Sequence, residues 1–129
     1  MQFLPYILAF ITLVFLVLQL YPYLKLRAVR GKIAPSLDKI LNTEQRKQSQ
    51  LLLYFMAPQC GMCRNITPII EELSQQRTDV VQVDIFRDVE VARELGVMGT
   101  PAFILIKDGI IEKVKLGGLS RDKILELLS

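Results

Sequence analysis

The chain has 129 residues, a length that suits one small domain with a short appendage. It contains no histidine, which excludes imidazole acid–base catalysis and most transition-metal sites. Its formal net charge of +3 is concentrated in residues 25–32. The remainder is therefore close to neutral and lacks the basic stripe of a nucleic-acid-binding domain, so no nucleic-acid partner is expected.

Residues 3–24 carry no charged side chain. As a helix this segment spans about 33 Å, close to the thickness of the hydrocarbon core of a bilayer. Tyr6, Tyr21 and Tyr23 lie near its ends, where amphipathic rings favour the membrane interface. We therefore expect residues 1–24 to form one transmembrane helix. A cleaved secretory signal is the alternative, but such signals begin with basic residues and have a shorter apolar core.

The segment 25–35 is expected to be a basic juxtamembrane connector, because four cationic residues directly follow the apolar run. These residues are Lys25, Arg27, Arg30 and Lys32. No Lys or Arg precedes the run, so the positive-inside rule places the following domain in the cytoplasm of a single-pass membrane protein. The periplasmic, or extracytoplasmic, face is the alternative. Attraction to anionic lipid headgroups also accounts for these charges.

Residues 36–129 are expected to form one domain of alternating strands and helices. Four apolar or alternating runs predict strands, at 51–56, 80–85, 102–106 and 110–116. Helical spacing and capping residues predict helices that begin at Ser36, cover 60–76 with a kink at Pro68, cover 88–95 before Gly96, and follow Ser120. The Asp108-Gly109 pair predicts a hairpin between the last two strands. This order indicates an α/β fold with a mixed sheet.

The only two cysteines, Cys60 and Cys63, lie in the turn between the first predicted strand and the helix that follows it. A CxxC pair at such a turn is typical of dithiol redox chemistry, because the helix start stabilises a thiolate there. Further along the chain, Gly99-Thr100-Pro101 leads into another predicted strand.

Together these motifs resemble the thioredoxin family, whose pattern the chain follows over residues 51–129. The matching residues are Ala57, Cys60, Cys63, Pro68, Gly96, Gly99, Pro101, Lys107, Gly109 and Gly117. Residues 32–50 are compatible with the first strand and helix of that family. The resemblance implies a thioredoxin fold, a central mixed sheet flanked by helices, preceded here by one transmembrane helix.

The resemblance also implies a thiol–disulfide oxidoreductase that contributes to cell redox homeostasis. Cys60 corresponds to the nucleophilic thiol and Cys63 to the buried resolving thiol. The implied partners are protein disulfide substrates and a thiol electron donor. No cofactor is expected beyond the redox-active Cys60–Cys63 disulfide, and a cytoplasmic location would make the protein a reductase.

A substrate groove is implied next to the dithiol. Pro101 corresponds to the family's cis-proline, where the Thr100 backbone meets an extended substrate strand. Gly99 and Gly117 would leave room for that strand, although each glycine also suits a simple turn.

Several residues around the dithiol depart from the family pattern. Gln59 replaces the usual tryptophan, and Tyr54 replaces the buried aspartate that helps to deprotonate the resolving cysteine. The lysine that accompanies that aspartate corresponds to Gln82. A tyrosine hydroxyl, with an ordinary pKa of about 10, is a poor base at neutral pH. We therefore expect Cys63 to lose its proton to water or to the Cys60 thiolate.

Gly61-Met62 stands between the cysteines where thioredoxin has Gly-Pro. Without proline, a backbone N–H becomes free near the Cys60 sulfur. This change predicts a lower pKa for Cys60 and a more oxidising disulfide than that of thioredoxin.

Two other functions stay open from the sequence. Cys60, Met62 and Cys63 offer soft sulfur ligands that suit Cu(I), although no dedicated metal-ligand set is expected, because structural zinc needs four ligands. The second is a non-catalytic binding module that uses the groove at Pro101. The missing aspartate favours this module, and the intact pair of cysteines opposes it.

Overall fold

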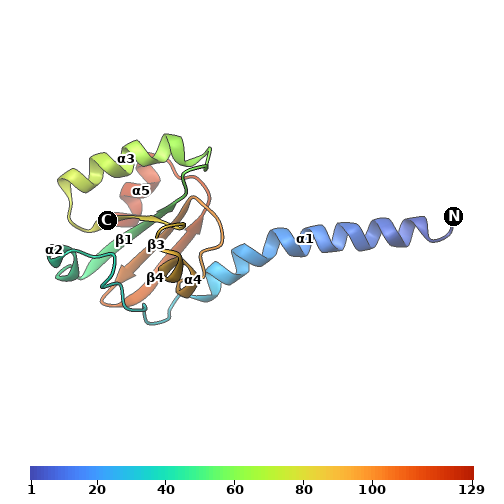
Figure 1. Ribbon diagram of the computed structural model, residues 1–129, viewed down its shortest axis with the longest axis horizontal. Coiled ribbons are helices and arrows are strands. Elements are labelled where there is room, and N and C mark those ends of the chain that lie inside the picture. Colours follow the sequence, from blue (N-terminus) through green and yellow to red (C-terminus); the bar gives the residue numbers. More distant parts are fainter.

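The computed structural model describes residues 1–129 and shows a four-stranded sheet with helices on both faces (Figure 1). In the spatial order β2-β1-β3-β4, the strands are β1 (Gln50–Met56), β2 (Val80–Asp84), β3 (Ala102–Lys107) and β4 (Ile110–Leu116). β1 pairs in parallel with β2, and β3 pairs antiparallel with both β1 and β4. The helices are α1 (Leu4–Ala28), α2 (Thr43–Arg46), α3 (Cys63–Gln76), α4 (Val89–Glu94) and α5 (Arg121–Leu128). This architecture confirms the predicted mixed α/β sheet.

β1 lies inside the sheet and is buried on both of its faces. Successive side chains of a strand point to opposite sides. Leu52 and Tyr54 pack with α3 and α5, whereas Leu53 and Phe55 pack with α4 and the end of α1. Because helices cover both faces, β1 is a continuous apolar run rather than an alternating one.

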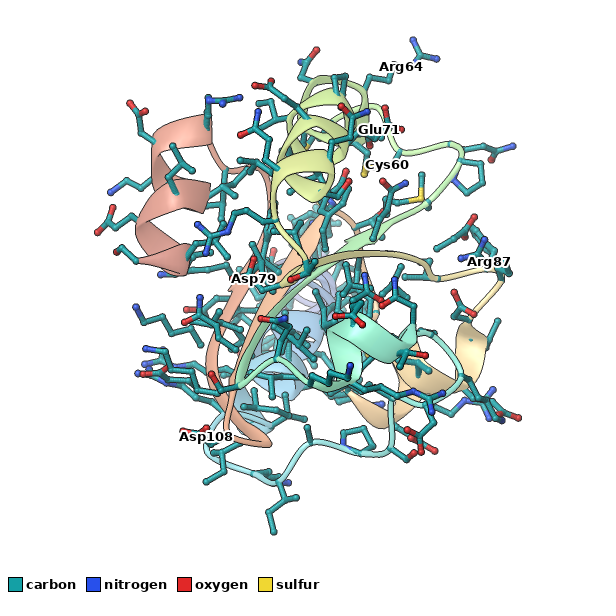
Figure 2. The ribbon with its side chains drawn as sticks, turned by 90° about the vertical axis from the view of Figure 1, so that its left-hand side faces the viewer. Cys60, Arg64, Glu71, Asp79, Arg87 and Asp108 are labelled. Carbon is teal, nitrogen blue, oxygen red and sulfur yellow. A yellow bond between two sulfur atoms is a disulfide. The ribbon has the colours of Figure 1, made fainter.

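Local sequence signals determine where several elements end. Asp108 and Gly109 join β3 to β4 with φ angles of 50° and 76°, a conformation that Asp-Gly favours. Asp108 and Cys60 lie at opposite ends of the domain (Figure 2). Ser120 caps α5 by accepting a hydrogen bond from the Lys123 N–H. These features confirm the predicted hairpin and the predicted start of the last helix.

The helix predicted to begin at Ser36 does not form. Residues 38–40 form only a turn, and the Ser36 hydroxyl donates to the Asp38 carboxylate at 2.9 Å instead of capping a helix. Leu37 is nevertheless buried, so an apolar residue at helical spacing reaches the core without a helix. The prediction was wrong because the Ser36 hydroxyl is engaged by the Asp38 carboxylate and accepts no backbone N–H that would start a helix.

A single helical turn, α2, forms later instead. Asn42 and Gln45 make a reciprocal capping box that satisfies the backbone N–H groups at its start. Ile33 forms only an isolated bridge with Ile110. Residues 32–50 therefore supply less regular structure than the strand and helix expected from the family pattern.

α1 is long and apolar enough to cross a membrane by length and composition. Its most apolar 18-residue window has a mean hydropathy of 2.2, and none of that window is buried in the domain. A signal sequence has the same properties, so α1 is a candidate span.

The last turns of α1 pack on the domain. The helix continues to Ala28, beyond the end expected at residue 24, and Leu26 is only 2% exposed in the core on the α4 side. Val29 packs against the same core. The helix continues because burial of Leu26 and Val29 stabilises the additional turn and because no helix-breaking residue follows residue 24 directly.

The segment after α1 lies along β4 instead of extending into solvent. The Gly31 N–H donates to the Ile111 carbonyl at 2.7 Å, and the Ile111 N–H donates to the Lys32 carbonyl at 2.9 Å. This part of the segment expected to be the basic juxtamembrane connector therefore lies along the domain.

We expect Gly96→Ala to destabilise the protein more than Gly31→Ala. Both glycines have positive φ, of 72° and 84°, so each alanine pays a conformational penalty of about 1 kcal/mol. At Gly96 the added Cβ would also lie 3.3 Å from the Lys25 carbonyl oxygen, whereas at Gly31 it would meet no atom within 4 Å. Thermal unfolding of the full chain in detergent measures the difference. Equal losses would show that α1 does not dock at Gly96.

Candidate functional site

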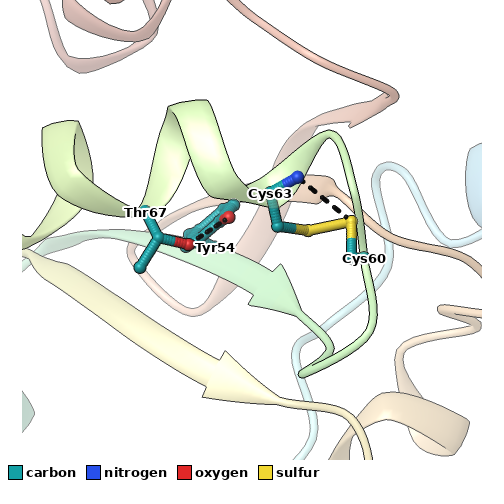
Figure 3. Close-up of a disulfide and its surroundings, with 4 residues drawn as sticks. All are labelled: Tyr54, Cys60, Cys63 and Thr67. Carbon is teal, nitrogen blue, oxygen red and sulfur yellow. Dashed lines mark hydrogen bonds between the residues drawn. A yellow bond between two sulfur atoms is a disulfide. The ribbon is translucent and has the colours of Figure 1, made fainter.

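The two cysteines lie where β1 ends and α3 begins, and they form a disulfide (Figure 3). α3 starts at Cys63 rather than at Cys60, because a turn precedes it in which the Cys60 N–H donates to the Ala57 carbonyl. The Cys63 N–H donates to Cys60 Sγ at 3.2 Å. The sequence predicts a backbone N–H near the Cys60 sulfur that the loss of proline sets free, whereas the donor in the structure is the Cys63 amide. This bond and the start of α3 favour negative charge on Cys60 when the pair is reduced.

The two cysteines differ in exposure. Cys63 is 2% exposed, whereas Cys60 is half-buried at the surface of its loop. Gln59, Gly61 and Met62 around it are exposed. A partner molecule can therefore reach the Cys60 sulfur, and Cys63 is placed to react with Cys60 alone.

The loop that leads into β3 lies beside this turn. Ala102 pairs with Phe55, near the end of β1. Pro101 is buried, and the Thr100–Pro101 peptide bond is cis. The Gly117 N–H donates to the Pro101 carbonyl at 2.8 Å, which ties the end of β4 to this loop. The structure thus brings Thr100, Pro101 and Gly117 to the edge of the sheet that carries the disulfide.

Three glycines border the same edge. At Gly117, with φ of 99°, an added Cβ would meet no atom within 4 Å, and at Gly99 it would meet Leu116 Cδ1 at 3.8 Å. At Gly118 it would lie 3.2 Å from Met62 Cε. Gly118 therefore allows the end of β4 to approach the dithiol turn. Gly118 was not predicted as a site residue, and its only sequence signal is its position next to Gly117.

Tyr54 fills the space beneath the dithiol with a neutral group. It is fully buried, its hydroxyl lies 3.0 Å from Thr67 Oγ1 (Figure 3), and its ring centroid lies 5.3 Å from that of Phe103. Burial raises the pKa of Tyr54, and the hydrogen bond to Thr67 offsets only part of that effect. The half-buried Gln82 is the strand partner of Tyr54, so no acid enters from β2 at this position. The hydroxyl stays neutral and cannot take a proton from Cys63.

Thr67 is a residue that sequence reasoning does not identify. It lies four residues after Cys63, on the same face of α3, which is the only local signal for its position. Arg64, the next residue after Cys63, is exposed and points away from α3 into solvent (Figure 2). The structure contains no group of three or more His, Cys, Asp or Glu side chains placed to hold a metal ion.

Comparison with known proteins gives one consistent relationship. A family model described as thioredoxin matches residues 32–129. The chain is 31% identical over 100 residues to thioredoxin of Bacillus subtilis (strain 168), which covers 75% of this chain and 95% of that protein. It is 33% identical over 95 residues to thioredoxin Asp f 28 of Aspergillus fumigatus, covering 71% and 88% of the two chains. The structure of reduced Schistosoma mansoni thioredoxin pre-protein superposes with a TM-score of 0.58 at 32% identity, over 66% of this chain and 81% of that one.

We expect Tyr54→Phe to lower the free energy of unfolding by about 1 kcal/mol, because it leaves Thr67 Oγ1 without its partner. The ring still packs on Phe103. The pH profile of the reaction between the reduced cysteines and a small disulfide reagent should not change, because the Tyr54 hydroxyl neither gives nor takes a proton in that reaction. Thermal unfolding and stopped-flow kinetics measure the two quantities. A displaced pH profile in Tyr54→Phe would contradict the neutral role assigned to this residue.

Proposed function

This chain belongs to the thioredoxin family and has the thioredoxin fold, and we propose that it is a membrane-tethered thiol–disulfide oxidoreductase that reduces protein disulfides. The observation that carries the proposal is the Cys60–Cys63 disulfide at the start of α3, with one sulfur accessible and the other buried. In this role the protein would contribute to cell redox homeostasis.

The proposed reaction begins with Cys60 as a thiolate. It attacks one sulfur of the substrate disulfide, the substrate S–S bond breaks, and the released substrate thiolate takes a proton from solvent. Cys63 then loses its proton and attacks the Cys60 sulfur, which forms the Cys60–Cys63 disulfide and releases the second substrate thiol. Two electrons pass from the protein to the substrate. A dithiol donor protein restores the reduced pair through the reverse exchange.

The environment of the two cysteines supports these separate roles. The Cys63 N–H, 3.2 Å from Cys60 Sγ, stabilises the attacking thiolate. Because the neutral side chains of Tyr54 and Thr67 lie beneath the pair, we propose that solvent water accepts the proton of Cys63. This route differs from the buried carboxylate of the family pattern.

We assign substrate binding to the loop at Pro101. An extended substrate segment would lie along Thr100 and Pro101 so that its cysteine meets Cys60. The open space at Gly117 and the modest contact of Gly99 with Leu116 support this placement, because neither glycine presents a side chain to the segment. Gln59, Gly61 and Met62 would form the other wall of the contact.

The tether is the second part of the proposal. We assign residues 1–24 to the membrane span, 25–35 to the basic juxtamembrane segment and 36–129 to the redox domain. The uncharged run and the candidate span in α1 support this division. The basic residues that follow the run support a single-pass topology with the domain in the cytoplasm.

We expect Cys60→Ser to abolish reductase turnover, because no other thiol can begin the exchange. Cys63→Ser should accumulate mixed disulfides with substrates, because the intermediate can no longer be resolved. Non-reducing gels of membranes from cells that express each full-length variant detect these adducts, which dithiothreitol should release. The double variant Cys60→Ser/Cys63→Ser is the matched control and should form none. Absence of adducts in Cys63→Ser would overturn the redox proposal.

A cytoplasmic domain predicts low activity when alkaline phosphatase, which is active only outside the cytoplasm, is fused after Ser129. Lys25→Gln with Arg27→Gln should raise that activity by weakening the retention signal. Protein level and membrane association serve as controls for each fusion. High phosphatase activity in the unmodified chain would reverse the assigned topology.

A further inference from the structure

α1 joins the domain at the edge that carries the disulfide. Tyr23, Leu26 and Arg27 line a surface pocket together with the last residues of β4, 114–116. On the opposite side of the same helix turn, Lys25 lines a pocket with Met98, in the loop before Pro101. The last turns of α1 therefore lie beside two segments that border the dithiol.

The chain then runs away from that edge. The Arg30 guanidinium donates to the Glu112 carbonyl at 2.9 Å, and the Ala34 N–H donates to the Gly109 carbonyl at 2.8 Å at the hairpin. Since β4 runs from Ile110 to Leu116, residues 23–34 pass beside it in the opposite direction. Traced backward toward the N-terminus, α1 extends away from the domain on the side where β1 ends and α3 begins, as Figure 1 shows.

Little chain separates the apolar span from the core of the domain. Leu24 is the last residue of the uncharged run, and Leu26, two residues later, is buried in the core. Two helical residues advance only about 3 Å along the axis. The junction is a continuous helix, and Gly96, which has no Cβ, allows the Lys25 carbonyl to lie close to it. The domain therefore has no flexible linker about which it could rotate.

The dithiol edge also exposes an apolar rim, which consists of Met62, Phe86, Met98 and Leu116. Their exposed fractions are 57%, 69%, 50% and 37%. Phe86 belongs to this edge because the preceding Ile85 N–H donates to the Met56 carbonyl, at the end of β1. The opposite end of the sheet exposes two large apolar side chains beside the hairpin, Ile33 and Ile110. The rim suits the boundary between headgroups and acyl chains better than open water.

We propose that the substrates are disulfides of integral membrane proteins that lie at the bilayer surface, beneath the dithiol edge of this domain. The inference rests on the proposed function, and it adds that Cys60 faces the membrane from which α1 emerges. The exchange is the one given above, with the membrane protein's disulfide supplying the two sulfurs that become thiols. A soluble protein would have to enter the gap between this edge and the bilayer to reach Cys60.

Two lipid-anchored disulfide probes test this inference with the full chain in nanodiscs. One probe carries a fluorophore joined by a disulfide directly to the lipid headgroup, and the other holds the same disulfide on a long polyethylene glycol spacer above the height of the domain. The protein is reduced beforehand, so a single turnover needs no added donor. We expect the short probe to react several-fold faster than the long one. A faster reaction with the long probe would show that the dithiol faces away from the membrane and would overturn the proposal.

A lifted variant provides the matched control. Seven helix-forming residues, including Glu and Lys, are inserted after Leu24. The insertion raises the domain by about 10 Å and rotates it about the helix axis by nearly two full turns. The ratio of short-probe to long-probe rates should fall several-fold in this variant, while reduction of a soluble disulfide reagent stays unchanged. An unchanged ratio would overturn the inference. Failure of the unmodified chain to reduce even the soluble reagent would instead overturn the proposed function itself.

Discussion

Burial of β1 on both faces is the constraint on which the rest of the structure depends. Leu52, Leu53, Tyr54 and Phe55 are all 0% exposed, with alternate residues assigned to the two halves of the core. A shift of one residue would exchange the two faces of the strand, so its register is strongly determined. The end of β1, and with it the turn that carries the dithiol, therefore has one position relative to α3 and β3.

The same core connects the redox site to the N-terminal helix. Leu26 of α1 and Phe55 of β1 belong to one cluster, so the helix that precedes the domain helps to complete its interior. In soluble domains a membrane anchor can be joined through a flexible linker, whose length decides the reach of the site. In this chain the last turns of α1 pack directly on the domain. The direction in which Cys60 faces thus becomes a property of the fold, and the proposed choice of substrates follows from it.

Beneath the dithiol, the chain replaces an ionisable group with a hydrogen-bonded neutral pair. A carboxylate at the position of Tyr54 would have to be buried among apolar side chains, where its charged form is strongly disfavoured. Tyr54 and Thr67 satisfy each other's hydrogen bonding and place no charged group there. In the proposed reaction, the backbone N–H of Cys63 and the start of α3 then stabilise the Cys60 thiolate.

The sequence by itself determined the strands, the Asp108-Gly109 hairpin and the place of the CxxC turn, because apolar periodicity and turn chemistry are local properties. It also indicated that Tyr54 lies beneath the dithiol, through resemblance rather than through contacts. It was wrong about a helix at Ser36, where local side-chain hydrogen bonds prevailed. Only the tertiary structure decided that Thr67 partners Tyr54 and that Leu26 enters the core. Both depend on how separate helices and strands pack together, and no local pattern specifies which surfaces meet.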